Sequence, residues 1–215
     1  MSARHGVAER RQAPFGSAHY ATCYADHLVL GAPSLCVRRA TSGVSSRVMK
    51  AGEKRQIREA EFAKVAGKFC RLIEGHRAMS REAFQEVVLR NLSLLYAVAL
   101  QLRSSSKTSD LQARRITHVQ WEQLFKSLGR KLGTHQRYWV VFNPLAEEKP
   151  LVGNLADDLA DIYRDLKPGL LAFTRGRTRE KAAAVWAWQV GFIQHWGHHA
   201  ASAIRVLHEL GAAIH

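Results

Sequence analysis

Apolar residues recur three and four positions apart over most of the chain from Glu53 to His208, and this helical period decides what the sequence can fold into. A segment with this spacing carries its apolar side chains on one helix face, which must be buried against other helices. In the first segment, residues 53–75, the apolar face consists of Phe62, Val65, Ala66, Phe69 and Ile73. In the second, residues 80–102, it consists of Phe84, Val88, Leu92, Leu95, Ala99 and Leu102.

Polar residues at the expected starts of these segments are typical helix N-caps. Ser80 precedes the second helix, and Thr117 with Gln120 forms a capping-box pattern before the third, residues 117–132. Asn154 is expected to cap a fourth helix, residues 154–173, and the fifth and longest covers residues 178–208. Five helices predict an all-α fold, a single five-helix bundle.

A loop of about twenty residues separates the third and fourth helices, an unusual length for a structureless connection. Its apolar run "YWVVF", residues 138–142, could form one short strand, but no partner strand is visible in the sequence. We expect this aromatic loop to lie across the bundle as a lid or plug. The side chains expected to line a pocket there are Trp139, Phe142, Trp188 and Phe192.

Residues 1–52 differ from the rest because they are rich in Ala, Ser, Gly and Arg and have no sustained period. We interpret them as a poorly ordered basic arm in front of a helical domain over residues 53–210. Met49 is an alternative translation start, in which case residues 1–48 would not belong to the native protein. The alternative function of the arm is a basic tether to an anionic surface.

The chain is strongly basic, with 32 Lys and Arg against 18 Asp and Glu and a net charge of +14. This excess favours polyanionic partners, but no run of five or six like charges and no nucleic-acid-binding motif accompanies it. No apolar stretch is long enough for a membrane span. The three cysteines show no metal-ligand spacing, which indicates a reducing cytoplasm.

Two histidines in the fifth segment are the first candidates for a functional site. At 100° per residue, His195 and His199 lie on the same helix face as Trp188 and Phe192, and this face is turned to the bundle interior. Side chains at i and i+4 stack one turn apart, so two imidazoles with this spacing can reach one metal ion.

The fourth helix carries four carboxylates in nine residues: Asp157, Asp158, Asp161 and Asp165. The helix dipole accounts for the first two but not for the later pair. On a helical wheel Asp158 and Asp165 flank the apolar stripe, whereas Asp157 and Asp161 lie nearer the solvent. We therefore predict that Asp158 and Asp165 meet the two histidines between the fourth and fifth helices.

Three interpretations of this candidate polar site remain open at this point. In the first, the histidines are buried and hydrogen-bonded by Asp158, Asp165 or Tyr163, with Asp161 also in the polar site. In the second, His195, His199, Asp158 and Asp165 hold a divalent transition metal, namely zinc, manganese or ferrous iron. In the third, the same groups carry out acid–base chemistry without a metal.

Three separated blocks of the sequence resemble one known family. These are "YWVVFNP" (138–144), "GNLADDLADIYRDLK" (153–167) and "AVWAWQVGFIQHWGHHA" (184–200). They are similar to a bacterial family, domain of unknown function 5063, over about residues 60–209. The resemblance implies no activity or cofactor. It shows three departures, with His198 in place of Arg, Asn143 in place of Asp and Ala187 in place of Glu. If those acidic positions contribute to a site elsewhere, this chain has a weakened one.

These observations favour a cytoplasmic bacterial helical domain that acts as a protein-interaction or regulatory module with a protein partner. A metal-dependent enzyme with its Asp/His site between the fourth and fifth helices is the second hypothesis. A nucleic-acid-associated protein that uses the basic arm is the third. The first predicts a fully folded metal-free protein, the second stoichiometric metal, and the third salt-dependent binding to nucleic acid.

Overall fold

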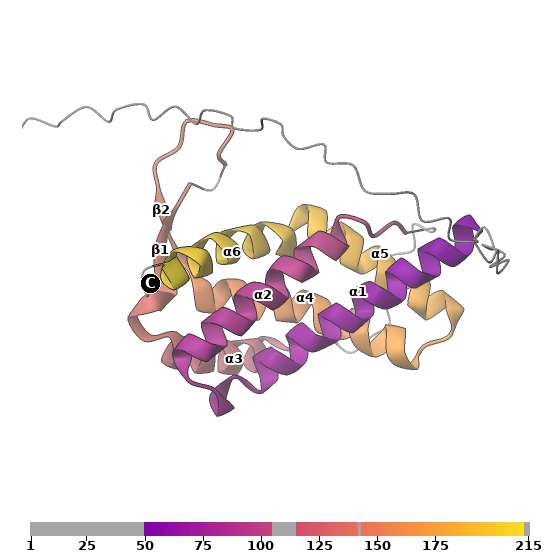
Figure 1. Ribbon diagram of the computed structural model, residues 1–215, viewed down its shortest axis with the longest axis horizontal. Coiled ribbons are helices and arrows are strands. Elements are labelled where there is room, and N and C mark those ends of the chain that lie inside the picture. The colour runs from indigo at the N-terminus through magenta and orange to yellow at the C-terminus, as the bar shows by residue number, and fades with distance from the viewer. Residues whose placement is uncertain (1–49, 105–114, 142, 213–215) are drawn as a thin grey trace, which may run out of the picture. The chain divides into compact units, whose positions relative to one another are not determined.

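The computed structural model describes residues 50–104, 115–141 and 143–212, so the predicted arm lies almost wholly outside the described residues. The described part contains six α-helices and one small sheet (Figure 1). Their bounds are α1 Ala51–Glu74, α2 Arg81–Ala99, α3 His118–Leu132, β1 Arg137–Val140, β2 Leu151–Asn154, α4 Leu155–Arg175, α5 Thr178–Gln194 and α6 Trp196–Ala212. Short 3-10 turns follow α1 (η1, His76–Ala78) and α3 (η2, Gly133–Gln136). The prediction of a mostly helical bundle is confirmed.

Helix α4 lies at the centre of the bundle and packs against α1, α3, α5 and α6, while α2 covers α1 and α6. The apolar faces predicted for residues 53–75 and 80–102 are buried without exception. Aromatic side chains fill the middle of the core, where the ring centroids of Phe62 and Trp188 lie 4.9 Å apart. This packing leaves α4 little contact with water, so its polar side chains must find partners within the protein.

The three predicted N-caps are present. The Ser80 hydroxyl accepts a hydrogen bond from the Ala83 amide, and Thr117 with Gln120 forms the complete capping box. The Asn154 side chain accepts from the amides of the first turn of α4, so β2 leads directly into that helix without a linker.

The aromatic loop is a β-hairpin, which corrects the prediction of an unpaired segment. Strands β1 and β2 are antiparallel, with Tyr138 opposite Gly153 and Trp139 opposite Val152. The hairpin projects from one end of the bundle (Figure 1). Tyr138 faces inward, and its ring lies so close across Gly153 that a Cβ there would be 2.4 Å from Tyr138 Cζ. A residue without a side chain at position 153 is therefore required for this packing.

The prediction of one long fifth helix over residues 178–208 is wrong, because α5 and α6 meet at a break. His195 separates them with φ −147° and ψ −82°, outside helical geometry. The break lets the Trp196 indole fold back onto α5, where its Nε1 donates to the Trp188 carbonyl at 3.1 Å. The bundle therefore has six described helices rather than five.

Gly197 makes the break sterically feasible. A Cβ at this position would lie 2.1 Å from the carbonyl oxygen of Phe192 and 3.0 Å from Phe192 Cδ2. The first of these atoms belongs to the backbone and cannot move aside as a flexible side chain would.

Among the described residues, no helix has both the length and the apolar composition needed to cross a membrane.

We predict that Gly197→Ala destabilises the protein by about 1–3 kcal/mol, the usual cost of overpacking, because the added methyl group displaces α5 or α6 at the junction. Denaturation with urea would measure the change. Gly211→Ala is the matched control in the same helix, since a Cβ there meets nothing within 4 Å. A Gly197→Ala protein as stable as the Gly211→Ala protein would contradict this account of the break.

Candidate metal centre

The histidines at the α5–α6 junction meet the carboxylates of α4. Nδ1 of His195 lies 2.8 Å from Asp165 Oδ2, and Nδ1 of His199 lies 2.8 Å from Asp158 Oδ1. An ionised carboxylate only accepts hydrogen bonds, so Nδ1 of each imidazole carries the proton and donates it. In the neutral form of each ring, Nε2 then has a free lone pair.

Both Nε2 atoms face the same third carboxylate. The distance to Asp161 Oδ2 is 3.5 Å from His199 Nε2 and 3.8 Å from His195 Nε2. One ligand atom from each of these three residues lies within 4.8 Å of the other two. The two imidazole rings are also adjacent, with centroids 4.8 Å apart in an edge-on arrangement.

Asp161 is fixed by two donors on the oxygen that faces away from the histidines. Trp121 Nε1 of α3 donates to Asp161 Oδ1 at 2.6 Å, and Arg164 contacts the same oxygen at 3.0 Å. The Arg164 guanidinium in turn lies over the Trp121 ring, 5.5 Å from its centroid. These contacts leave Oδ2 of Asp161 directed at the two imidazoles.

Asp158 is fixed in a comparable way from the hairpin. The Tyr138 hydroxyl donates to Asp158 Oδ2 at 2.6 Å, while Oδ1 accepts from His199. Both oxygens of this buried carboxylate are therefore paired. Burial and the charge of Asp158 raise the pKa of Tyr138 above its usual value, so the phenol remains a donor.

The carboxylates also determine the electrostatics at His199. Burial lowers the pKa of His199, but the hydrogen bond to Asp158 and the charges of Asp158, Asp161 and Asp157 outweigh it, and the net pKa is raised. The pKa of Asp157 is raised as well, by burial first and then by the negative charge of Asp161. The site therefore has an excess of negative charge that a cation would offset.

The cluster is most exposed to solvent at His195. The side chains of Asp158 and Asp161 are 7% and 10% exposed, that of His199 24% and that of His195 41%. A ligand or water molecule therefore has its most open approach beside His195.

The helical wheel predicts Asp161 near the solvent, whereas the structure buries it at 7% exposure. The helical wheel considered α4 alone, and α3 covers that flank of α4 and supplies Trp121. Tyr163, also expected in the site, instead donates to Glu74 of α1 at 2.8 Å.

Three of the four expected pocket-lining aromatic residues are described, and they lie in different surroundings rather than in one pocket. Trp188 is fully buried in the core, and Phe192 packs edge-on against Tyr96 with ring centroids 5.0 Å apart. Trp139 is 72% exposed on the outer face of the hairpin, and Phe142 lies outside the described residues.

The expected pairing of Arg164 with Asp161 is present, at 3.0 Å. Sequence reasoning missed two residues that hold the site together, Trp121 and Tyr138. A signal for both was present, because a half-buried indole N–H or phenol needs a hydrogen-bond partner. What the sequence lacked was the pairing of β1 with β2, which directs Tyr138 inward.

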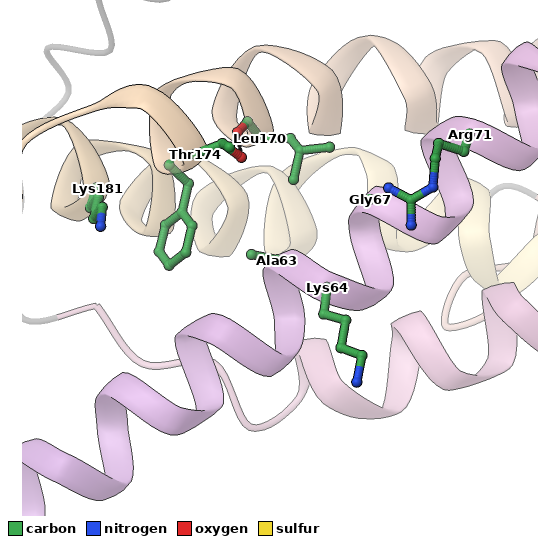
Figure 2. A pocket seen from close by; sticks show the side chains of 8 residues that line it. Ala63, Lys64, Gly67, Arg71, Leu170, Thr174 and Lys181 are labelled. Atoms are coloured by element: carbon green, nitrogen blue, oxygen red, sulfur yellow. Dashed lines mark hydrogen bonds between the residues drawn. The ribbon is translucent and has the colours of Figure 1, made fainter.

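A surface pocket of about 500 Å³ lies elsewhere, between α1 and the α4–α5 turn (Figure 2). Lys64, Arg71 and Lys181 contribute positive charge to its lining, and Arg71 lies next to Gly67. Neither the histidines nor the aspartates of the cluster line this pocket, so it is a separate feature.

The family assignment follows from a match over residues 55–213 to the family described as "Domain of unknown function (DUF5063)". The chain belongs to this family. The DUF5063 chain is also similar to the crystal structure of protein BF1032 from Bacteroides fragilis, with 28% sequence identity and a TM-score of 0.62. That similarity covers 70% of this chain and 90% of the other. No curated protein matches the sequence.

The raised pKa of His199 predicts a pH-dependent stability of this DUF5063 protein without metal. The folded state binds the proton more tightly than the unfolded state, so the stabilising contribution is complete below the ordinary histidine pKa of 6.5 and is lost as the pH rises past the folded pKa. We expect the free energy of unfolding, measured with urea and a chelator present, to fall more steeply with rising pH in the wild type than in His199→Gln. Equal pH dependence in both proteins would contradict the assignment.

Proposed function

We propose that this domain binds a divalent transition metal through His195 Nε2, His199 Nε2 and Asp161 Oδ2, and that the metal retains an open position for water. The single observation that carries the proposal is the convergence of these three atoms, each with its other polar atom already engaged. In this assignment Asp158 and Asp165 orient the histidines rather than bind the metal themselves.

The types of ligand support zinc as the first candidate, because zinc binds imidazole nitrogen and carboxylate oxygen in sites of few ligands. The separations from Asp161 Oδ2 to the two Nε2 atoms are 3.5 and 3.8 Å, and the ligand atoms lie within 4.8 Å of one another. Manganese and ferrous iron, which also accept imidazole and carboxylate ligands, are the next candidates.

The hydrogen bonds around the ligands support the same proposal. Metal-binding histidines usually donate their second ring N–H to a carboxylate or carbonyl, which fixes the ring and raises its basicity. Both histidines here donate Nδ1–H to an aspartate. Histidines that served only as satisfied core groups would not need both Nε2 atoms directed at one further carboxylate oxygen.

Three protein ligands with a solvent-facing side are typical of a catalytic rather than a structural metal site. A zinc ion held by these residues would lower the pKa of a bound water and supply a nucleophile near neutral pH. We therefore propose metal-assisted hydrolysis as the class of chemistry. The hypothesis of a metal-free interaction module, which the sequence alone favours, makes the opposite prediction about metal content.

We predict that tag-free protein titrated with zinc binds one ion per chain and that His199→Ala and His195→Ala abolish this binding, because each removes a ligand. Isothermal titration with elemental analysis would measure the stoichiometry, and Co²⁺ substitution would give a tetrahedral visible spectrum. His198→Ala is the matched control, since His198 is the exposed neighbour of His199.

Two results would overturn the proposal. The first is a wild-type protein that takes up none of zinc, manganese or ferrous iron in stoichiometric amount. The second is equal loss of metal in the His198→Ala and His199→Ala proteins, which would indicate adventitious binding to surface imidazoles. Circular dichroism of each variant separates loss of ligands from loss of fold.

A further inference from the structure

The hairpin of β1 and β2 is attached to the metal centre at two points that lie close together in the sequence. Asn154 ends β2 and caps α4, and Asp158 follows one turn later on the same helix. The second attachment is the hydrogen bond from Tyr138 of β1 to Asp158. On the outer face of the hairpin, Trp139 and Val152 lie opposite each other and are 72% and 61% exposed.

A continuous series of hydrogen bonds runs from the hairpin to a metal ligand. The Tyr138 hydroxyl donates to one oxygen of Asp158 at 2.6 Å, and the other oxygen accepts from His199 Nδ1 at 2.8 Å. Asp158 is 5% exposed, so water cannot readily replace either partner. If the Tyr138 hydroxyl no longer donates to Asp158, the carboxylate loses one of its two donors and can rotate more freely. The orientation of the His199 ring is then less well defined.

We propose that Tyr138 is a positioning residue for the metal centre, and that docking of the hairpin and binding of the metal strengthen each other. This inference rests on the proposed metal site. It adds a regulatory property to that site. Any event that separates the hairpin from α4 lowers the affinity for the metal, and removal of the metal weakens the contact between the hairpin and α4. Reciprocity is required by thermodynamics, since one free energy of coupling connects the two events.

The hairpin meets the bundle through Tyr138 of its inner face, whose ring packs against the hydrophobic core. Gly153 provides the space for the Tyr138 ring on the inner face of the hairpin. On the outer face, Trp139 and Val152 are exposed to solvent. Two-stranded hairpins are marginally stable without packing against another element. The hydrogen bond from Tyr138 to Asp158, together with the contact of the Tyr138 hydroxyl with Ser202 of α6, holds the inner strand against the bundle.

The test compares zinc affinity and hairpin protection in the wild type, Tyr138→Phe and Trp139→Phe. Tyr138→Phe removes only the hydroxyl, and we expect it to weaken zinc binding about 10- to 100-fold, as changes in residues that orient metal ligands do. Trp139→Phe alters the exposed face of the same strand and should leave the affinity unchanged. Competition with a chromophoric chelator would give the dissociation constants.

Two further measurements separate positioning from a general structural effect. The visible spectrum of the Co²⁺ protein should change in Tyr138→Phe but not in Trp139→Phe, because only the first alters the orientation of His199. Hydrogen exchange of the amides of residues 137–154 should slow on addition of zinc to the wild type, and this difference should shrink in Tyr138→Phe.

The outcomes distinguish failure of the coupling from failure of the metal site. If wild-type protein binds no metal, the proposed function is wrong. If it binds zinc and Tyr138→Phe binds zinc equally well with an unchanged Co²⁺ spectrum, the coupling is wrong and the metal site stands. Equal weakening in both hairpin variants would also overturn the coupling through Tyr138.

Discussion

The burial of two carboxylates on α4 is the constraint on which the rest of the site depends. A helix that packs against four others cannot direct Asp158 and Asp161 into water, and an unpaired buried carboxylate would be costly. The protein satisfies them with donors from three neighbouring elements: the Tyr138 phenol of the hairpin, the Trp121 indole of α3 and the His199 imidazole of α6. The elements that surround α4 are in this way tied to one polar centre.

Much of the fold could be predicted because it depends on local chemistry. The caps at Ser80, Thr117 and Asn154 involve residues within three positions of one another, and the helical period marks the buried faces directly. The hairpin was missed because its second strand is only four residues long and contains Gly153 and Asn154, which disfavour strands. The break at His195 was missed because it depends on the packing of Trp196 against α5, which no local pattern records.

The candidate site could be predicted only in part. The wheel identified which aspartates of α4 point toward the histidines, since that depends on the geometry of one helix at a time. It misplaced Asp161 because the cover provided by α3 is a tertiary property, and it assigned Tyr163 to the wrong neighbour for the same reason. The donors that orient the carboxylates, Trp121 and Tyr138, come from elements whose packing could not be derived from their own segments.

The break between α5 and α6 means that His195 and His199 do not lie on one continuous helix, since His195 is at the break itself and His199 is in α6. In an unbroken helix the rise and rotation per residue would fix the distance between the ring nitrogens of His195 and His199. Here a small rotation about the backbone of one residue changes the gap between the ring nitrogens, while Trp196 keeps the bend anchored in the interior. In the proposed metal site, this freedom would let the two imidazoles adjust to the radius of the bound ion while the bundle beneath them stays packed.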